Sequence, residues 1–177
     1  MSRLSKNLDE MEFGGTLAGA GVLAGTGSIV ESSVSRVGGI IRTDVLVDLT
    51  GMNDGGTIDD IIGNDGGAID SWIVKITDDV NGVILAATVY GHELPAGGDP
   101  DIDFWSASDG TLAQDTLITA AADEVLLVDA GDMSATSVVN FTAWPADGTY
   151  IYMACGTNTA ADYTAGRFIL SLWGQVV

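Results

Sequence analysis

Three aspartates alternate in the sequence Asp99-Pro-Asp-Ile-Asp103. Carboxylate oxygens spaced in this way begin the loops that bind calcium, a hard cation that prefers oxygen ligands. The later spacing departs from such a loop, because Phe104 stands sixth, where the turn needs glycine, and Gly110 stands twelfth, where a bidentate glutamate is needed. The residues leave open whether Asp99, Asp101 and Asp103 bind a cation.

The residue types needed for most catalysis are scarce in this chain. Nucleophilic catalysis by serine or cysteine needs an imidazole, and the one histidine, His92, is accompanied by no Gly-x-Ser-x-Gly elbow. One histidine and one cysteine, Cys155, cannot supply a zinc or iron cluster. The stretch Gly19-Ala-Gly-Val-Leu-Ala24 matches the dinucleotide fingerprint formally, but neither the strand nor the helix that the motif needs is predicted beside it. We therefore expect that the protein is not an enzyme and binds no cofactor, and its motifs assign no metal site.

The 25 acidic residues offer many carboxylate pairs of the kind that glycosidases use. Nearly all of them are aspartates at predicted turns, where aspartate hydrogen-bonds the backbone and tolerates left-handed conformations. Solvated turn residues are the preferred interpretation.

The net charge of -19 is unevenly spread along the chain. Residues 1–43 hold four acids and four bases, so the whole excess of acid lies in residues 44–177. Such a charge repels nucleic-acid phosphates and anionic membranes, so we expect neither as a partner. The N-terminal stretch lacks the apolar region of a secretory signal, and one cysteine cannot form an intrachain disulfide, which fits synthesis in a reducing cytoplasm.

Short β-branched runs separated by turn residues predict an all-β protein. Asp78-Asp79-Val80-Asn81-Gly82 predicts a hairpin with a type I′ turn, because Asn-Gly readily adopts two positive φ angles. Thr57 to Ile62 predicts a helical turn with Thr57 as N-cap. The expected strands are 40–49, 72–77, 83–90, 102–107, 117–120, 125–128, 138–144, 150–155 and 167–173.

The glycines of residues 14–27 disfavour a helix. We expect residues 1–27 to form an extended N-terminal arm and residues 28–177 to form a single domain, an antiparallel β-sandwich that is jelly-roll-like. A loop packed on its own domain is the alternative for the glycine-rich stretch.

Three stretches of the chain resemble head decoration (cement) proteins of tailed bacteriophages, of the cyanophage and marine phage type. They are Glu31-Ser-Ser-Val-Ser-Arg-Val-Gly38 with the following strand, Leu94-Pro-Ala-Gly-Gly-Asp-Pro-Asp-Ile-Asp103, and Ala161-Asp-Tyr-Thr-Ala-Gly-Arg-Phe-Ile-Leu-Ser-Leu-Trp-Gly174. The resemblance implies a β-sandwich or jelly-roll protein, commonly a homotrimer, that sits on the capsid exterior and clamps neighbouring major capsid proteins.

The expected function is therefore that of a virion structural protein that binds the outside of the phage head. A lectin-like receptor-binding or tail-associated virion protein is the alternative. In the first case the neutral N-terminal part docks onto the capsid and the acidic body faces water. The docking candidates are Arg3, Lys6, Phe13, Arg36 and Arg42.

Overall fold

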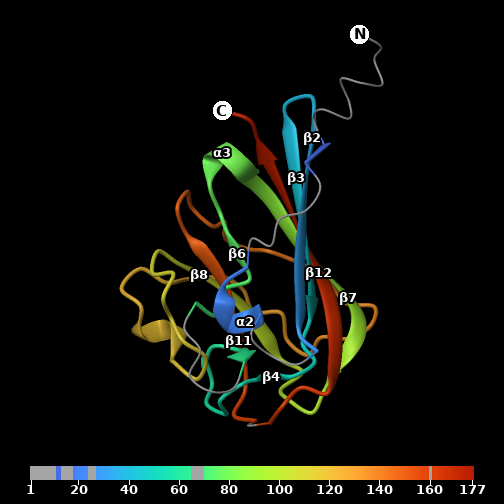
Figure 1. The fold of residues 1–177 in the computed structure, drawn as a ribbon, viewed down its shortest axis with the longest axis vertical. Coiled ribbons are helices and arrows are strands. Elements are labelled where there is room, and N and C mark those ends of the chain that lie inside the picture. The colour runs from blue at the N-terminus through green and yellow to red at the C-terminus, as the bar shows by residue number, and fades with distance from the viewer. Residues whose placement is uncertain (1–10, 13–17, 24–26, 65–69, 160) are drawn as a thin grey trace.

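The computed structural model describes residues 11–12, 18–23, 27–64, 70–159 and 161–177, which form two main antiparallel sheets (Figure 1). The prediction of an all-β, antiparallel sandwich is confirmed, whereas the jelly-roll arrangement and the extended arm are not. The strands are β1 (Met11–Glu12), β2 (Ile29–Val37), β3 (Ile40–Asp48), β4 (Met52–Asn53), β5 (Gly63–Asn64), β6 (Val74–Lys75), β7 (Val83–Ala96), β8 (Ile102–Ala107), β9 (Val125–Val128), β10 (Val138–Asn140), β11 (Tyr150–Cys155) and β12 (Ala165–Gln175). The helices are α2 (Ala20–Leu23), α3 (Asp78–Asn81) and the 3₁₀ turn η1 (Ile118–Ala120).

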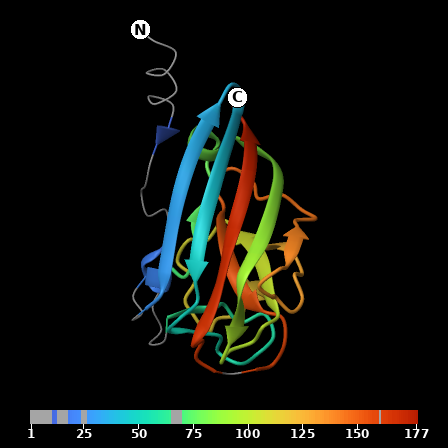
Figure 2. The same cartoon turned by 90° about the vertical axis from the view of Figure 1, so that its right-hand side faces the viewer.

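The larger sheet has six strands in the order β1-β2-β3-β12-β7-β10. The long strands β2, β3, β12 and β7 lie side by side, as Figure 2 shows. Alternation along β3 explains its two faces, because Val45 and Val47 are fully buried while Arg42 is exposed and Leu46 is partly exposed. One face of the sheet therefore covers the core, and the other, here called the outer face, meets solvent.

The smaller sheet has four strands in the order β6-β11-β8-β9 and is covered on both faces. One face packs against the larger sheet through Phe104, which lies edge-on to Phe168 of β12 with ring centroids 5.4 Å apart. The other face carries Tyr152, which packs with Ile61 and Ile118 from the covering loops. Cover on both sides explains why five of the six residues of β11 are buried.

The predicted hairpin with a type I′ turn at Asn81-Gly82 is wrong. Residues 78–81 form α3 instead, and the strands before and after it, β6 and β7, belong to different sheets. The reason lies in side chains that hold the helix: Thr77 caps its N-terminus by accepting from Val80 N, and buried Asn81 accepts from Thr77 N (2.9 Å) and donates to Thr43 Oγ1 (3.0 Å). The chain therefore crosses from one layer to the other at α3.

Other expected elements differ in extent. Within the predicted strand 117–120, Leu117 makes an isolated bridge to Asp60 and residues 118–120 form the 3₁₀ turn η1. Strand pairing is limited to Val74–Lys75 and Val138–Asn140 within two other predicted strands. Thr57 to Ile62 forms turns rather than a helix. The predicted strands 102–107, 125–128 and 150–155 have the same bounds in the structure.

Part of the glycine-rich stretch packs on the body. Gly19 N donates to the carbonyl of Trp72 (2.9 Å), Gly21 N donates to that of Asp70 (3.1 Å), and Val22 is fully buried. A Cβ at Gly19 would lie 1.9 Å from the Asp70 carbonyl oxygen, so only glycine fits this approach. Residues 19–22 therefore pack on the sandwich, as the alternative to a free arm expects, but residues 20–23 form the short helix α2, which the glycines were expected to disfavour.

Candidate functional site

The two ends of the sandwich differ in chemistry. At the end where β7 finishes and β12 begins, loops distant in sequence bring carboxylates together. This acid-rich end is defined by Asp54, Asp99, Asp101, Asp103, Asp129 and Asp132.

Two of these acids hold the loops in place through backbone hydrogen bonds. Buried Asp54 accepts from Asp99 N (2.7 Å) and from Ala161 N (3.0 Å). Buried Asp99 accepts from Asp101 N (3.0 Å) and from both the backbone N (2.8 Å) and the hydroxyl of Thr157. The carboxylate of Asp99, one of the three aspartates singled out by their spacing, is therefore committed to supporting the loop.

The other two aspartates of that motif, Asp101 and Asp103, meet Asp129 from the loop that follows β9. Each of the three offers a carboxylate oxygen, and these oxygens lie within 4.8 Å of one another. Burial, followed by the charge of Asp129 and then that of Asp101, raises the pKa of Asp103 to about 7. Burial and then Asp129, Asp99 and Asp132 likewise raise the pKa of Asp101. The three carboxylates repel one another in a partly dry setting.

The opposite end of the larger sheet is apolar. Strand register places the hairpin between β2 and β3 beside the start of β7 and the end of β12, and Val176 N donates to the Gly39 carbonyl (3.0 Å). Figure 2 shows the C-terminus beside the tip of this hairpin. The exposed aliphatic residues here, called the apolar end, are Val37 (77% exposed), Ile40 (44%), Val83 (45%), Val176 (43%) and Val177 (89%).

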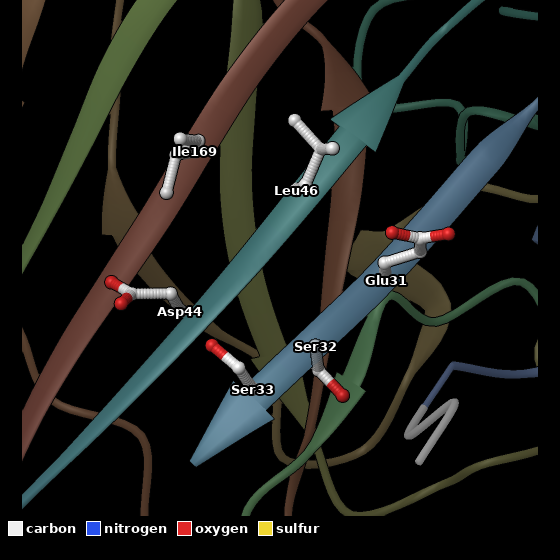
Figure 3. A pocket seen from close by; sticks show the side chains of 6 residues that line it. All are labelled: Glu31, Ser32, Ser33, Asp44, Leu46 and Ile169. Carbon is white, nitrogen blue, oxygen red and sulfur yellow. The ribbon is translucent and has the colours of Figure 1, made fainter. Parts of the chain in front are cut away.

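The outer face of the larger sheet carries a row of apolar residues. The register puts Leu46 beside Ile169, Ile169 beside Tyr90 and Tyr90 beside Val138, across four strands. Open depressions of about 250 Å³ and 470 Å³ flank Leu46 and Ile169. Figure 3 shows the smaller one, with side chains from β2, β3 and β12 around it. Shallow, open hollows of this kind suit contact with another surface better than enclosure of a small molecule.

The predicted docking residues are only partly described, and the two that the structure describes, Arg36 and Arg42, lie on opposite faces of the larger sheet. Arg3, Lys6 and Phe13 lie outside the described residues. Arg42 lies on the outer face, where it pairs with Asp44 (2.9 Å) and stacks over Trp173 (5.7 Å to the ring centroid). Arg36 lies on the opposite face of the sheet and donates to the carbonyl of Asp79 in α3.

The two residues considered for nucleophilic catalysis, His92 and Cys155, lie on different sheets. His92 is exposed on β7 beside the larger depression on the outer face. Cys155 is buried, its Sγ donates to the Thr57 carbonyl (2.8 Å), and burial raises the pKa of its thiol to about 12. A thiol with that pKa stays protonated at neutral pH and is a poor nucleophile.

Sequence reasoning missed two features of these ends. Asp129 is one of the 25 acidic residues and was not singled out, although the pairing of β9 with β8 carries it to Asp103. The apolar end was also missed, although Val37 directly precedes the glycine pair Gly38-Gly39, whose turn exposes the residues beside it.

Among the described residues, no helix is long and apolar enough to cross a bilayer. Comparison with known proteins found no matching family model, no matching curated protein and no matching solved structure.

Proposed function

We propose that this protein is a virion structural protein that binds the outer surface of a phage head, contacts the major capsid protein and stabilises the capsid lattice. The observation that carries the proposal is the apolar end, where five exposed aliphatic residues from three parts of the chain form one surface. Exposed apolar surface of this kind is typical of sites that bind another protein.

The energetics of the apolar end favour attachment in several copies. Burying a fully exposed valine stabilises by about 1.5–3 kcal/mol, so the five partly exposed residues of one apolar end supply a gain that is only comparable with the 4–15 kcal/mol that association costs. A homotrimer would present three apolar ends at once, and linked sites bind far more tightly than single ones. The proposal therefore includes the homotrimer.

The distribution of charge supports one orientation on the capsid. The acid-rich end lies at the other end of the sandwich from the apolar end. In the proposed orientation the apolar end faces the capsid and the acid-rich end faces water, where its charge keeps particles apart.

Co-sedimentation tests the proposal. Purified protein is mixed with heads assembled from the major capsid protein of the same virus, pelleted, and the bound copies are counted by quantitative mass spectrometry. Val37→Asp should weaken binding at least about tenfold, because one valine contact and the desolvation of a new charge each cost more than about 1.4 kcal/mol. Val37 is 77% exposed, so the variant should remain folded.

Leu94→Asp is the matched control, because Leu94 is 54% exposed but lies near the far end of β7. Equal loss of binding in both variants, or no co-sedimentation of the unmodified protein, contradicts the proposal. Light scattering tests the trimer, and a monomer at micromolar concentration argues against it.

A deletion at the N-terminus tests whether the predicted arm contributes to capsid binding. Because Val22 is buried, removing residues 1–27 would damage the sandwich, so the deletion should stop at residue 10. We expect this deletion to weaken binding and to leave the unfolding temperature unchanged. Full binding without residues 1–10 would show that Arg3 and Lys6 do not dock.

A further inference from the structure

We propose that Asp101, Asp103 and Asp129 form a binding site for calcium. Their three ligand oxygens lie within 4.8 Å of one another. Calcium binds oxygen at 2.3–2.6 Å, so two of its ligands are at most about 5 Å apart when they lie on opposite sides of the ion. Three oxygens around one ion at these distances are at most about 4.5 Å apart, so small adjustments of the side chains would bring all three carboxylates onto one ion.

One carboxylate oxygen of the cluster lacks a partner among the described residues, and a second carboxylate is weakly bonded. Asp101 Oδ1 is fully buried and accepts no hydrogen bond from the described residues. Asp103 is only 8% exposed, and within the same part of the chain its single hydrogen bond is a long one, from Ala130 N to Oδ1 (3.2 Å). A buried charged oxygen without a partner is costly, so these atoms indicate that a ligand belongs between them.

Within the part of the chain that the structure describes, no side chain of opposite charge pairs with these carboxylates. Among the described residues, each ion pair involves an arginine of the larger sheet, and none reaches the three aspartates. The nearby Asp132 adds to the negative charge rather than balancing it. A cation from solution is therefore the partner that the cluster lacks.

The chain holds the three ligands in place. Asp101 and Asp103 are two residues apart at the start of β8, so both side chains leave the same side of the strand. Asp129 follows β9, the neighbour of β8, and its Oδ1 accepts from Gly131 N (3.2 Å). The carboxylate of Asp101 lies over Gly156, where a Cβ would come within 2.4 Å of its Cγ. The cluster is thus fixed by two paired strands and one glycine.

The ligand chemistry selects the ion. The cluster has only oxygen donors, which excludes the sulfur and imidazole sites preferred by zinc. Magnesium demands near-ideal octahedral geometry, whereas calcium accepts irregular sets completed by water. The three acids come from two segments of the chain, and Asp129 is exposed, so the set is irregular and open to water, which suits calcium. We expect a Kd of about 10⁻⁴–10⁻³ M, the range of weak extracellular calcium sites.

Calcium titration of the full-length protein after EDTA dialysis tests the site. Isothermal titration calorimetry should show one calcium per chain. At a free calcium concentration of 100 Kd, binding lowers the unfolding constant about 100-fold. For a chain of this size, that change raises the unfolding temperature by about 5–10 °C.

Two variants and one control make the test specific. Asp129→Asn changes an exposed residue and so keeps the fold, while Asp103→Asn removes the buried ligand. Both should bind calcium at least tenfold more weakly and lose most of the rise in unfolding temperature. Asp103→Asn should also unfold at a higher temperature than the unmodified protein without calcium, because one repelling charge is gone.

Asp123→Asn is the control, because it removes one exposed acid outside the cluster, where Asp123 accepts from Ser108 N. This control should bind calcium as the unmodified protein does. No binding at millimolar calcium overturns the proposal. Equal weakening by Asp123→Asn and Asp129→Asn overturns it too, because it would mean diffuse attraction to an acidic surface. Magnesium binding as tight as calcium would overturn the choice of ion.

Discussion

The contact between Phe168 and Phe104 joins the two sheets. Removing it should lower the free energy of unfolding more than any substitution at the surface does. Phe168 is 1% exposed and Phe104 is fully buried, with ring centroids 5.4 Å apart and ring planes at 89°. This is the edge-to-face arrangement that aromatic rings prefer. Phe104 also lies 5.7 Å from Phe141, so the three rings form one aromatic centre.

The magnitude follows from burial. Replacing a buried phenylalanine by alanine costs about 3–5 kcal/mol, through lost transfer energy and the cavity left behind. We expect Phe168→Ala to lower the free energy of unfolding by this amount, which corresponds to roughly 6–20 °C in a chain of this size. Guanidinium denaturation followed by tryptophan fluorescence measures it, with Val177→Ala, at an 89% exposed position, as a control within about 0.5 kcal/mol.

A double-mutant cycle separates the ring contact from simple burial. Phe168→Leu and Phe104→Leu keep most of the apolar volume, so their coupling energy should reflect the aromatic pair, at about 0.5–1.5 kcal/mol. A coupling near zero, together with a loss below about 1 kcal/mol in Phe168→Ala, would refute the idea that these rings hold the layers together.

Two further predictions concern buried polar groups. Burial raises the pKa of Asp48, but hydrogen bonds from Thr50 and the charge of Arg167 outweigh it and hold that pKa below its usual value. Stabilisation by Asp48 is therefore complete above about pH 4 and is lost as the pH falls further, so Arg167→Gln should cost up to about 1 kcal/mol at pH 7 and nothing at pH 2 in urea denaturation. A cost that does not change with pH would contradict this pairing. Asn81→Ala should cost about 1–3 kcal/mol by thermal unfolding, because it leaves the Thr43 hydroxyl without its buried partner, and a loss below 0.5 kcal/mol would argue against that role.

Local pattern predicted some elements well and failed where side chains override it. β8 and β11 were predicted with the same bounds because each is an apolar run between turn residues. The Asn81-Gly82 turn failed because a contact with Thr43, distant in sequence, fixes Asn81 in a helix. The acid cluster was not predicted as a site: the spacing of Asp101 and Asp103 is visible in the sequence, but the arrival of Asp129 depends on strand pairing.

The place of β12 between β3 and β7 has a consequence for biosynthesis. Translation delivers β3 and β7 long before residues 165–175, yet both pair with β12 and not with each other. Until β12 leaves the ribosome, the nascent chain holds two long strands whose facing edges lack their shared neighbour, and such edges invite aggregation. The larger sheet therefore closes only after β12 emerges, which makes chaperones relevant to the yield of folded protein.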